Sequence, residues 1–260
     1  MTGSKQKLVV LQERDVHLLR ELGVMRVVDR EQAKMIGPFG STTRANARLL
    51  ALTEARYLRR FFWGTVGGAK KVIYALAPCG AEIAGVPNRG PRRSRDQVLA
   101  ADFFSLHQLQ VNEVYGSIKY RPLPEGVTFI RWLSFHESLP GTTLIPDGYA
   151  EVDHAEKLIS FFIEVDLGNE NRTVWQGKVR SYLSYGASGS FTREFENAQF
   201  RTLTVTNSES RLTSLRTATA ALTEKIFRFT TEERIKREGF WGRIWQKPKG
   251  DEREALIATP

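Results

Sequence analysis

The sequence of 260 residues is poor in the residues that build disulfides, thiolate sites and histidine-rich metal centres. It contains one cysteine, Cys79, and four histidines that form no closely spaced pair. A single cysteine excludes a disulfide framework and a cluster of thiolate ligands, and it is typical of a reducing compartment. The spacing of the histidines argues against a metal centre built on several imidazoles.

The sequence also lacks a long hydrophobic run. Its longest candidate, Leu158–Val165, is interrupted by Ser160 and Glu164, whereas a membrane-spanning helix needs about 20 predominantly apolar residues. The first residues form no apolar stretch of the kind found in secretory signals. We therefore expect a bacterial-type cytoplasmic protein that does not enter a membrane.

What the sequence does have is an excess of positive charge, and all of it lies near the N-terminus. The chain has 38 Lys and Arg against 29 Asp and Glu, a net charge of +9. The first 100 residues hold 18 basic and 8 acidic residues, a net charge of +10, whereas the remainder holds 20 and 21. A basic block is typical of a module that binds nucleic acid, although mildly basic domains also occur for solubility alone.

The basic segment has the pattern of three helices followed by a hairpin. Apolar residues at helical spacing predict helices over Leu11–Leu22, over a short stretch after Asp29, and over Thr43–Ala55. Strand-like runs at Tyr57–Trp63 and Val72–Ala77 flank a glycine-rich turn. Three helices followed by a two-stranded wing are typical of a winged helix-turn-helix domain.

A linker and a second domain are predicted to follow. Residues 87–96 combine proline, glycine and arginine, which indicates a basic linker. Beyond a long helix from Gln97 to about Ile118, we predict strands over Thr128–Phe135, Thr143–Val152, Leu158–Leu167 and Phe200–Val205, and helices over Thr173–Tyr185 and Glu209–Leu222. The aromatic residues of 230–250 are predicted to cover a core. The predicted domains are therefore 8–86 and 97–250, joined by the linker.

The third predicted helix carries the side chains that we expect to read DNA. In the major groove Arg pairs with guanine and Asn with adenine, and a recognition helix presents its N-terminal residues there. Basic residues of the wing and linker are expected to contact phosphates without sequence preference. The predicted DNA-binding residues are Thr42, Thr43, Arg44, Asn46 and Arg48 on the helix, Arg59, Arg60, Lys70 and Lys71 on the wing, and Arg92 and Arg93 in the linker. The alternative is an ordinary solvated helix face.

Acidic residues in the second half lie where an apolar strand is expected. Asp147 lies in the first half of one predicted strand, and Glu164 and Asp166, two residues apart, share a face of the next. Carboxylates in an apolar run are costly unless they meet a cation, a metal ion or solvent. Cleavage of a phosphodiester with Mg²⁺ or Mn²⁺ requires carboxylates that hold the cation and a lysine that stabilises the developing charge. Asp147, Glu164 and Asp166 are the candidate ligands, Lys178 is the candidate lysine, and Glu113 could add a further carboxylate. The alternative is a structural acid cluster paired with Arg or Lys.

The order of a helix with Glu, a strand, Pro-Asp, a second strand and Glu-x-Asp resembles the PD-(D/E)xK nuclease fold. In that fold a lysine stands where this sequence has Asp166. Lys178, on the following predicted helix, is a candidate for a migrated substitute. We therefore predict a nuclease-like domain whose residues Glu113, Asp147, Glu164, Asp166 and Lys178 form the catalytic set only if the domain is active.

Motifs along most of the chain resemble the replication-relaxation family. They are Leu11–Asp15, Arg48–Leu52, Tyr74–Gly80, Leu106–Glu113, Pro146–Asp147 and Phe161–Asp166, followed by Lys178 and Tyr182. The resemblance spans about residues 10–245, and it implies a DNA-binding accessory protein of plasmid replication or mobilisation. The absence of a histidine pair argues against the nicking relaxase itself.

We therefore expect an α+β or α/β protein in which a winged helix-turn-helix precedes a restriction-endonuclease-like domain with a central mixed sheet. The expected function is sequence-specific binding of double-stranded DNA of a plasmid or mobile element, in replication, mobilisation or transcriptional regulation, with an inactive nuclease-like domain. The alternative is a Mg²⁺-dependent DNA endonuclease that uses Asp147, Glu164 and Asp166. Expected partners are double-stranded DNA, a second copy in a homodimer, and a relaxase or replication protein, at the nucleoid or a plasmid.

Overall fold

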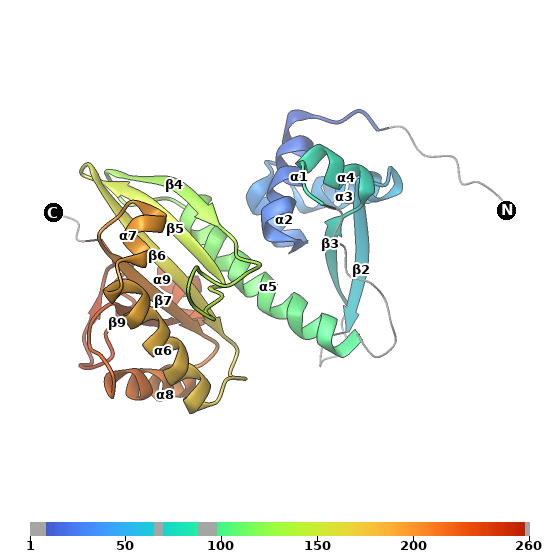
Figure 1. Cartoon of the computed structure of the whole chain (residues 1–260). Coiled ribbons are helices and arrows are strands. Elements are labelled where there is room, and N and C mark those ends of the chain that lie inside the picture. The colour runs from blue at the N-terminus through green and yellow to red at the C-terminus, as the bar shows by residue number, and fades with distance from the viewer. Residues whose placement is uncertain (1–8, 65–69, 88–97, 258–260) are drawn as a thin grey trace. The chain divides into compact units, whose positions relative to one another are not determined.

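The computed structural model of the chain describes residues 9–64, 70–87 and 98–257. The chain divides into two compact units, Met1–Gly116 and Ser117–Pro260. Each unit has its own β-sheet (Figure 1). Each also has its own hydrophobic core. The mixed α+β class predicted from the sequence is confirmed.

The first unit begins with helices and a small antiparallel sheet. In chain order its elements are α1 (Glu13–Met25), β1 (Val27–Asp29), α2 (Arg30–Ile36), α3 (Thr42–Glu54), β2 (Leu58–Gly64), β3 (Lys70–Leu76) and α4 (Pro78–Ala84). The short β1 pairs with β3, so the order of the sheet is β1-β3-β2. The three helices and the hairpin lie where the sequence predicted them, whereas β1 and α4 were not predicted.

Helix α5 (Val98–Lys119) is held to the first unit by buried amide side chains. Asn112 donates a hydrogen bond to the carbonyl oxygen of Val27 at 2.5 Å. Gln32 of α2 donates to the carbonyl oxygen of Leu109 at 2.8 Å. A buried amide is costly to leave without a partner, so these bonds fix the position of α5 along β1 and α2.

The second unit contains a seven-stranded mixed sheet of order β10-β9-β8-β7-β6-β5-β4. The strands are β4 (Val127–Leu133), β5 (Gly148–His154), β6 (Lys157–Asp166), β7 (Phe200–Thr206), β8 (Phe227–Thr231), β9 (Trp245–Gln246) and β10 (Arg253–Glu254). β6, β7 and β8 are parallel, and the flanking pairs are antiparallel. The predicted central mixed sheet is thus confirmed, but β5 begins at Gly148 rather than at Thr143, and β8 was not predicted.

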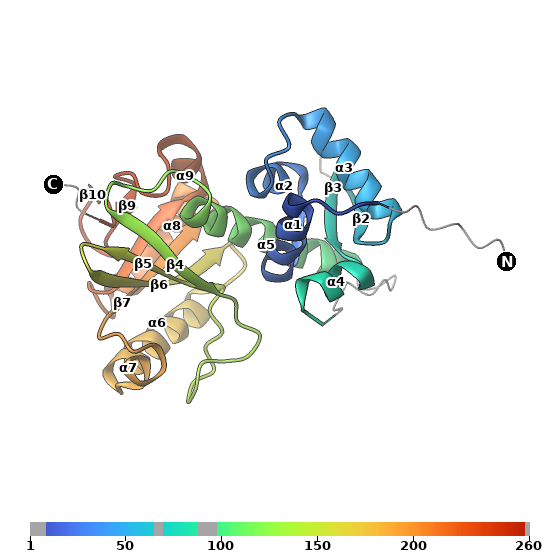
Figure 2. The ribbon, with the colours of Figure 1, turned by 90° about the horizontal axis from the view of Figure 1, so that it is seen from above.

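Figure 2 shows helices of the second unit lying against its sheet. Three of these helices share one aromatic core with the sheet. They are α6 (Arg172–Ala187), α7 (Ser190–Phe195) and α8 (Glu209–Ala220), and α9 (Glu232–Glu238) follows β8. Phe162 lies within this core, with its ring centroid 5.0 Å from that of Phe200 and 5.5 Å from that of Tyr182. Phe240, Ile244 and Trp245 of the tail are buried, as predicted. Within the described residues, no helix is long and apolar enough to cross a membrane.

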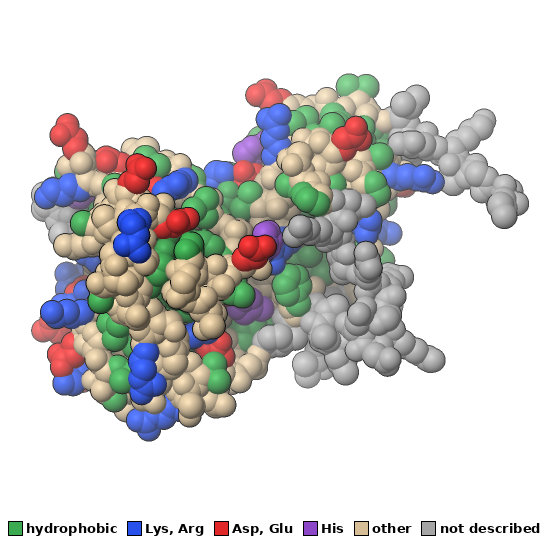
Figure 3. Space-filling model, viewed as in Figure 1, with side chains coloured by type: hydrophobic (Ala, Val, Ile, Leu, Met, Phe, Trp, Pro, Cys, Tyr) green, Lys and Arg blue, Asp and Glu red, His purple; other side chains and the backbone are tan. Residues whose placement is uncertain are grey.

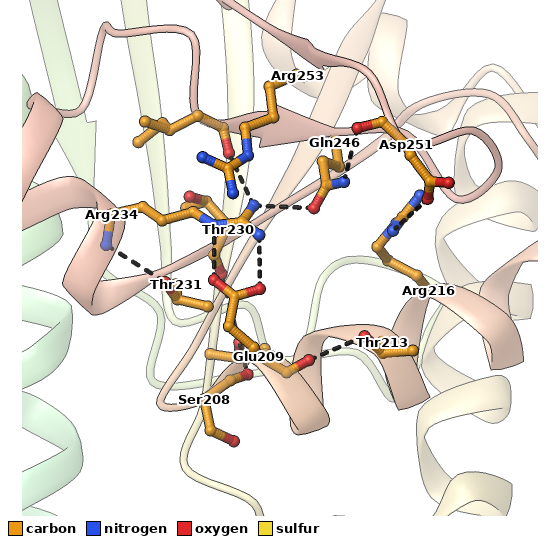
Figure 4. A network of polar contacts seen from close by, with 12 residues as sticks. Ser208, Glu209, Thr213, Arg216, Thr230, Thr231, Arg234, Gln246, Asp251 and Arg253 are labelled. Atoms are coloured by element: carbon orange, nitrogen blue, oxygen red, sulfur yellow. Dashed lines mark hydrogen bonds and ion pairs between the residues drawn. The ribbon is translucent and has the colours of Figure 1, made fainter.

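A buried arginine connects α8, α9 and β9 (Figure 4). Arg234 forms a bidentate ion pair with Glu209, with N–O distances of 2.7 Å and 2.5 Å. Its third guanidinium nitrogen donates to the amide oxygen of Gln246 at 2.8 Å. Bidentate geometry restricts both partners, so this arginine fixes the C-terminal strands against the last two helices.

The two edges of the large sheet are irregular or short. In β4, the strand at one edge, the register shifts between Phe129 and Arg131, so Ile130 has no partner in the pairing with β5. At the other edge, β9 and β10 have two residues each. Neither edge therefore offers a long, regular row of backbone donors and acceptors.

Candidate functional site

Helix α3 presents one face to the core of the first unit and the opposite face to solvent. Ser41 caps the helix, since its hydroxyl accepts a hydrogen bond from the backbone N–H of Arg44 at 3.2 Å. Ala45, Leu49 and Leu52 are fully buried at helical spacing. Thr43, Arg44, Asn46 and Ala47, in the first two turns, are exposed.

Three of the predicted DNA-binding residues lie on this exposed face. Thr43, Arg44 and Asn46 are all exposed in the first turn and a half of α3. The same face carries two apolar residues, Ala47 and Leu50, and the side chain of Leu50 is 40% exposed. The exposed face of α3 thus combines two side chains of the types that pair with base edges, Arg44 and Asn46, with the apolar side chains of Ala47 and Leu50.

Two other predicted residues of α3 have intramolecular partners. Arg48 forms an ion pair with Asp15 of α1, whose side chain is 0% exposed, and its Nε donates to the same carboxylate at 2.9 Å. The Thr42 hydroxyl accepts a hydrogen bond from Lys34 of α2 at 3.0 Å. The Asp15 contact raises the pKa of the Arg48 guanidinium through its hydrogen bond. Arg48 therefore joins α3 to α1.

The predicted wing residues are distributed along the β2–β3 hairpin. Arg59 is partly buried, and Arg60 is exposed with its guanidinium 5.0 Å from the ring centroid of Phe62. Lys71 forms an ion pair with Asp29 at 2.7 Å, and Asp29 is also the N-cap of α2. Lys70 is the first residue of β3, opposite Gly64, but its side chain lies outside the described part of the structure. Arg92 and Arg93 also lie outside the described residues.

The structure of the second unit brings Lys178 of α6 onto Glu164 of β6. The ammonium nitrogen of Lys178 lies 2.8 Å from Glu164 Oε2, and the Tyr182 hydroxyl donates to Oε1 at 2.5 Å. Lys178 also contacts Glu170 at 2.6 Å. Asp147 accepts a hydrogen bond from the backbone N–H of Val165 at 2.7 Å. Both oxygens of Glu164 thus have donors from one helix.

Asp166 lies one pleat further along β6 and has a different partner. Arg211 of α8 contacts both of its carboxylate oxygens, at 2.6 Å and 2.7 Å. The backbone N–H of Gly168 donates to the same carboxylate at 2.8 Å. The side chain of Asp166 is only 4% exposed. Both oxygens of this carboxylate therefore accept from Arg211, and Oδ1 also accepts from a backbone N–H.

Burial raises the pKa of Glu164 to about 7, above its ordinary value of 4.5. The positive charge of Lys178 lowers this pKa and the negative charge of Asp147 raises it, but the loss of hydration dominates. Burial alone would lower the pKa of Lys178, yet the attraction and hydrogen bond of Glu164 raise it instead. Lys178 therefore stays charged, while Glu164 titrates near neutrality.

The raised pKa of Glu164 predicts a pH dependence of stability. Because the folded chain holds this proton more tightly than the unfolded chain, the stabilisation is complete below about pH 4.5 and is lost as the pH rises through about 7. Glu164→Gln removes the titration, so the unfolding free energy of the wild type should fall relative to that of the variant, by on the order of 1 kcal/mol per pH unit in this window. Urea unfolding at pH 5, 6, 7 and 8 measures both slopes.

Glu125→Gln provides the matched control for this measurement, because Glu125 is exposed and lies on the same unit. It should leave the pH profile of the wild type unchanged. Parallel profiles for the wild type and Glu164→Gln between pH 5 and 7 would show that folding does not take up a proton at Glu164.

The acidic residues predicted to bind a divalent cation do not form a shared ligand set in the described structure. Among the described residues, no group of three or more His, Cys, Asp or Glu side chains is placed to hold a metal ion. Glu113 lies on α5 in the first unit, where it accepts a hydrogen bond from Gln32 at 3.0 Å. In the described structure both oxygens of Glu164 and of Asp166 accept from side-chain donors, which are Lys178 and Tyr182 for Glu164 and Arg211 for Asp166.

The sequence alone did not indicate which side chains pair with Arg48 of α3 or with the carboxylates of β6. Arg211 and Glu170 were not singled out, and Tyr182, named as part of the family resemblance, donates a hydrogen bond to Glu164. The carboxylates in an apolar run predicted a nearby cation, but the sequence did not identify Arg211 as that cation.

In Figure 3, Lys and Arg side chains on the visible face of the second unit are interspersed with Asp and Glu, in line with its near-neutral charge.

Comparison with known proteins adds one finding. The family model described as replication-relaxation matches residues 18–198, more than half of the chain. No curated protein matches the sequence. No solved structure matches it either.

Proposed function

We propose that this chain, which belongs to the replication-relaxation family, binds double-stranded DNA in a sequence-specific manner. Membership of this family suggests a role in plasmid replication or mobilisation. In this proposal the first unit is a winged helix-turn-helix domain, and α3 is its recognition helix. The protein acts in replication, in mobilisation beside a relaxase or replication protein, or in regulating the genes concerned. A homodimer on a palindromic site is part of the proposal.

The single observation that carries the proposal is the exposed face of α3. Arg44 and Asn46 are the residue types that pair bidentately with guanine and adenine, and both are exposed at the N-terminal end of a helix followed by a hairpin. The net charge of +10 in the first 100 residues supports attraction to a polyanion. Arg59 and Arg60 on β2 supply positive charge for backbone phosphates.

The test begins with selection of bound duplexes from random DNA and from fragmented plasmid DNA. We expect the full chain to enrich one motif. Arg44→Ala with Asn46→Ala should then lower the affinity for the selected duplex at least tenfold, since each bidentate base contact contributes about 1–3 kcal/mol. The affinity for a scrambled duplex should change much less. Fluorescence anisotropy at two salt concentrations measures both affinities.

Arg180→Ala serves as the matched control, because Arg180 is an exposed arginine on α6 of the second unit. It removes one positive charge and should leave the affinity for the selected duplex within twofold. If no motif is enriched, or if the double variant binds the selected and the scrambled duplex like the wild type, the proposal is wrong.

For the second unit we propose a scaffold with a nuclease-like fold and no catalysis. The ion pairs of Asp166 with Arg211 and of Glu164 with Lys178 support this role, because they occupy the carboxylates that a divalent cation needs. One observation favours the alternative of a Mg²⁺-dependent endonuclease: a lysine ammonium group lies 2.8 Å from Glu164, on the strand next to Asp147. Incubation of supercoiled DNA with Mg²⁺ or Mn²⁺ should give no cleavage. Cleavage that Asp147→Ala abolishes would establish the alternative.

A further inference from the structure

The exposed face of α3 has an apolar stripe that the pairing of Arg and Asn with bases does not explain. Thr43, Ala47 and Leu50 follow one another at intervals of four and three residues, so they lie in one line along the helix. All three are exposed, and Leu50 is 40% exposed. The buried residues Ala45, Leu49 and Leu52 lie on the opposite side. The centre of the solvent-facing surface is therefore apolar.

Polar and charged side chains lie on both sides of this stripe. Arg44 follows Thr43 by one residue, and Asn46 precedes Ala47 by one, so the helical turn places them on opposite flanks. Arg60 adds positive charge on the neighbouring hairpin. An apolar line with polar flanks also occurs in protein interfaces, but the net charge of +10 in the first 100 residues favours an anionic partner. The stripe and its two flanks are suited to a partner surface that is polar and anionic overall but carries isolated apolar groups.

The major groove of DNA has these properties. Its edges present hydrogen-bond acceptors and donors for Arg and Asn, phosphates line both sides, and the 5-methyl group of thymine is its one apolar feature. Side chains such as alanine and the methyl group of threonine contact that methyl group in protein–DNA complexes. An adenine read by Asn46 is paired with a thymine, so the apolar stripe beside Asn46 faces a groove edge in which methyl groups occur.

We propose that the stripe of Thr43, Ala47 and Leu50 reads thymine 5-methyl groups, so that the target half-site contains A·T pairs recognised by shape and apolar contact as well as by hydrogen bonds. This inference rests on the proposed function and specifies its target. Leu50 is the main contact, because it offers the largest apolar surface on the stripe. Burial of one methyl group against Leu50 should change affinity about fourfold.

The test uses the selected duplex with each thymine replaced, one at a time, by deoxyuridine, which differs only in the 5-methyl group. We expect the full-length wild type to lose about fourfold in affinity at one or two positions of each half-site. Leu50→Ala should weaken binding of the thymine duplex several-fold and should no longer distinguish thymine from deoxyuridine at one of these positions. Fluorescence anisotropy measures the affinities.

Leu106→Ala is the matched control, since Leu106 is an exposed leucine of the same unit, on α5. It should retain the wild-type affinity and the wild-type loss on deoxyuridine substitution. Circular dichroism of both leucine variants should show a folded chain, because both side chains are exposed.

The outcomes separate this inference from the proposed function. If a selected duplex is bound specifically but every deoxyuridine substitution leaves the affinity unchanged, the methyl contact is wrong and sequence-specific binding stands. If no duplex is bound specifically, the proposed function itself fails. If Leu50→Ala leaves DNA affinity unchanged and instead alters the oligomeric state in analytical ultracentrifugation, the stripe contacts protein, and the inference is overturned.

Discussion

Replacing Arg48 by alanine is expected to lower the free energy of unfolding of the first unit by about 3 kcal/mol, as for other buried ion pairs that lose one partner. The reason is the position of Asp15, whose side chain is fully buried beneath the guanidinium group. Without Arg48, this carboxylate keeps the backbone N–H of Gln12 as a donor at 2.7 Å but loses its counter-charge. Urea unfolding of the full chain measures the loss, and hydrogen exchange in α1 and α3 assigns it to this unit.

Arg44→Ala is the control that the chain itself offers. Arg44 lies four residues before Arg48 on the same helix, and the two substitutions remove the same charge. Because Arg44 is exposed, its replacement should change stability by no more than about 0.5 kcal/mol. Under the proposed function, Arg44→Ala weakens DNA binding while the fold persists, and Arg48→Ala weakens the fold. If instead Arg48→Ala weakens DNA binding and leaves the stability of the fold unchanged, Arg48 contacts DNA and its ion pair with Asp15 does not form.

Arg211→Ala should have an effect of similar size on the second unit, again about 3 kcal/mol. Asp166 is buried at the end of β6, and Arg211 contacts both of its oxygens. Loss of the guanidinium group leaves a buried carboxylate that retains only the Gly168 N–H among its described donors. Arg211→Lys keeps the charge but not the two parallel bonds, so its stability should fall between that of the wild type and that of the alanine variant.

A double variant distinguishes the loss of an ion pair from the loss of packing. Asp166→Asn in the Arg211→Ala background removes the uncompensated charge and should recover about half of the lost stability. Thermal and urea unfolding of the wild type, Arg211→Ala, Asp166→Asn and the double variant complete a double-mutant cycle. If the double variant is no more stable than Arg211→Ala, the stability came from packing of the arginine side chain and not from its charge.

The sequence predicted the elements that have regular apolar spacing. Helix α3 and the β2–β3 hairpin are examples, because Ala45, Leu49 and Leu52 repeat at the helical period and the glycine-rich turn separates two strand-like runs. Strand β1 was missed because three residues are too few to show a period. The start of β5 was placed too early because Pro146, which has no N–H to donate, was read as part of the strand.

The candidate site was predicted less completely, because its decisive contacts join residues distant in sequence. Asp15 and Arg48 are 33 positions apart, and Asp166 and Arg211 are 45 positions apart. Exposed and paired arginines look alike in a sequence, so Arg44 and Arg48 were assigned the same role. Lys178 was singled out as a substitute for the missing lysine, and the packing of α6 on β6 brings it to Glu164.

The irregular edges of the large sheet limit how copies of this protein associate. A long, regular edge strand acts as a template for the same strand of another molecule and promotes aggregation into fibres. The shifted register at Ile130 of β4 interrupts such a template, and the two-residue strands at the other edge are too short to extend it. The large sheet should therefore resist growth by strand addition at its edges, which leaves the side-chain surfaces of the second unit, rather than backbone pairing in its sheet, for association between copies.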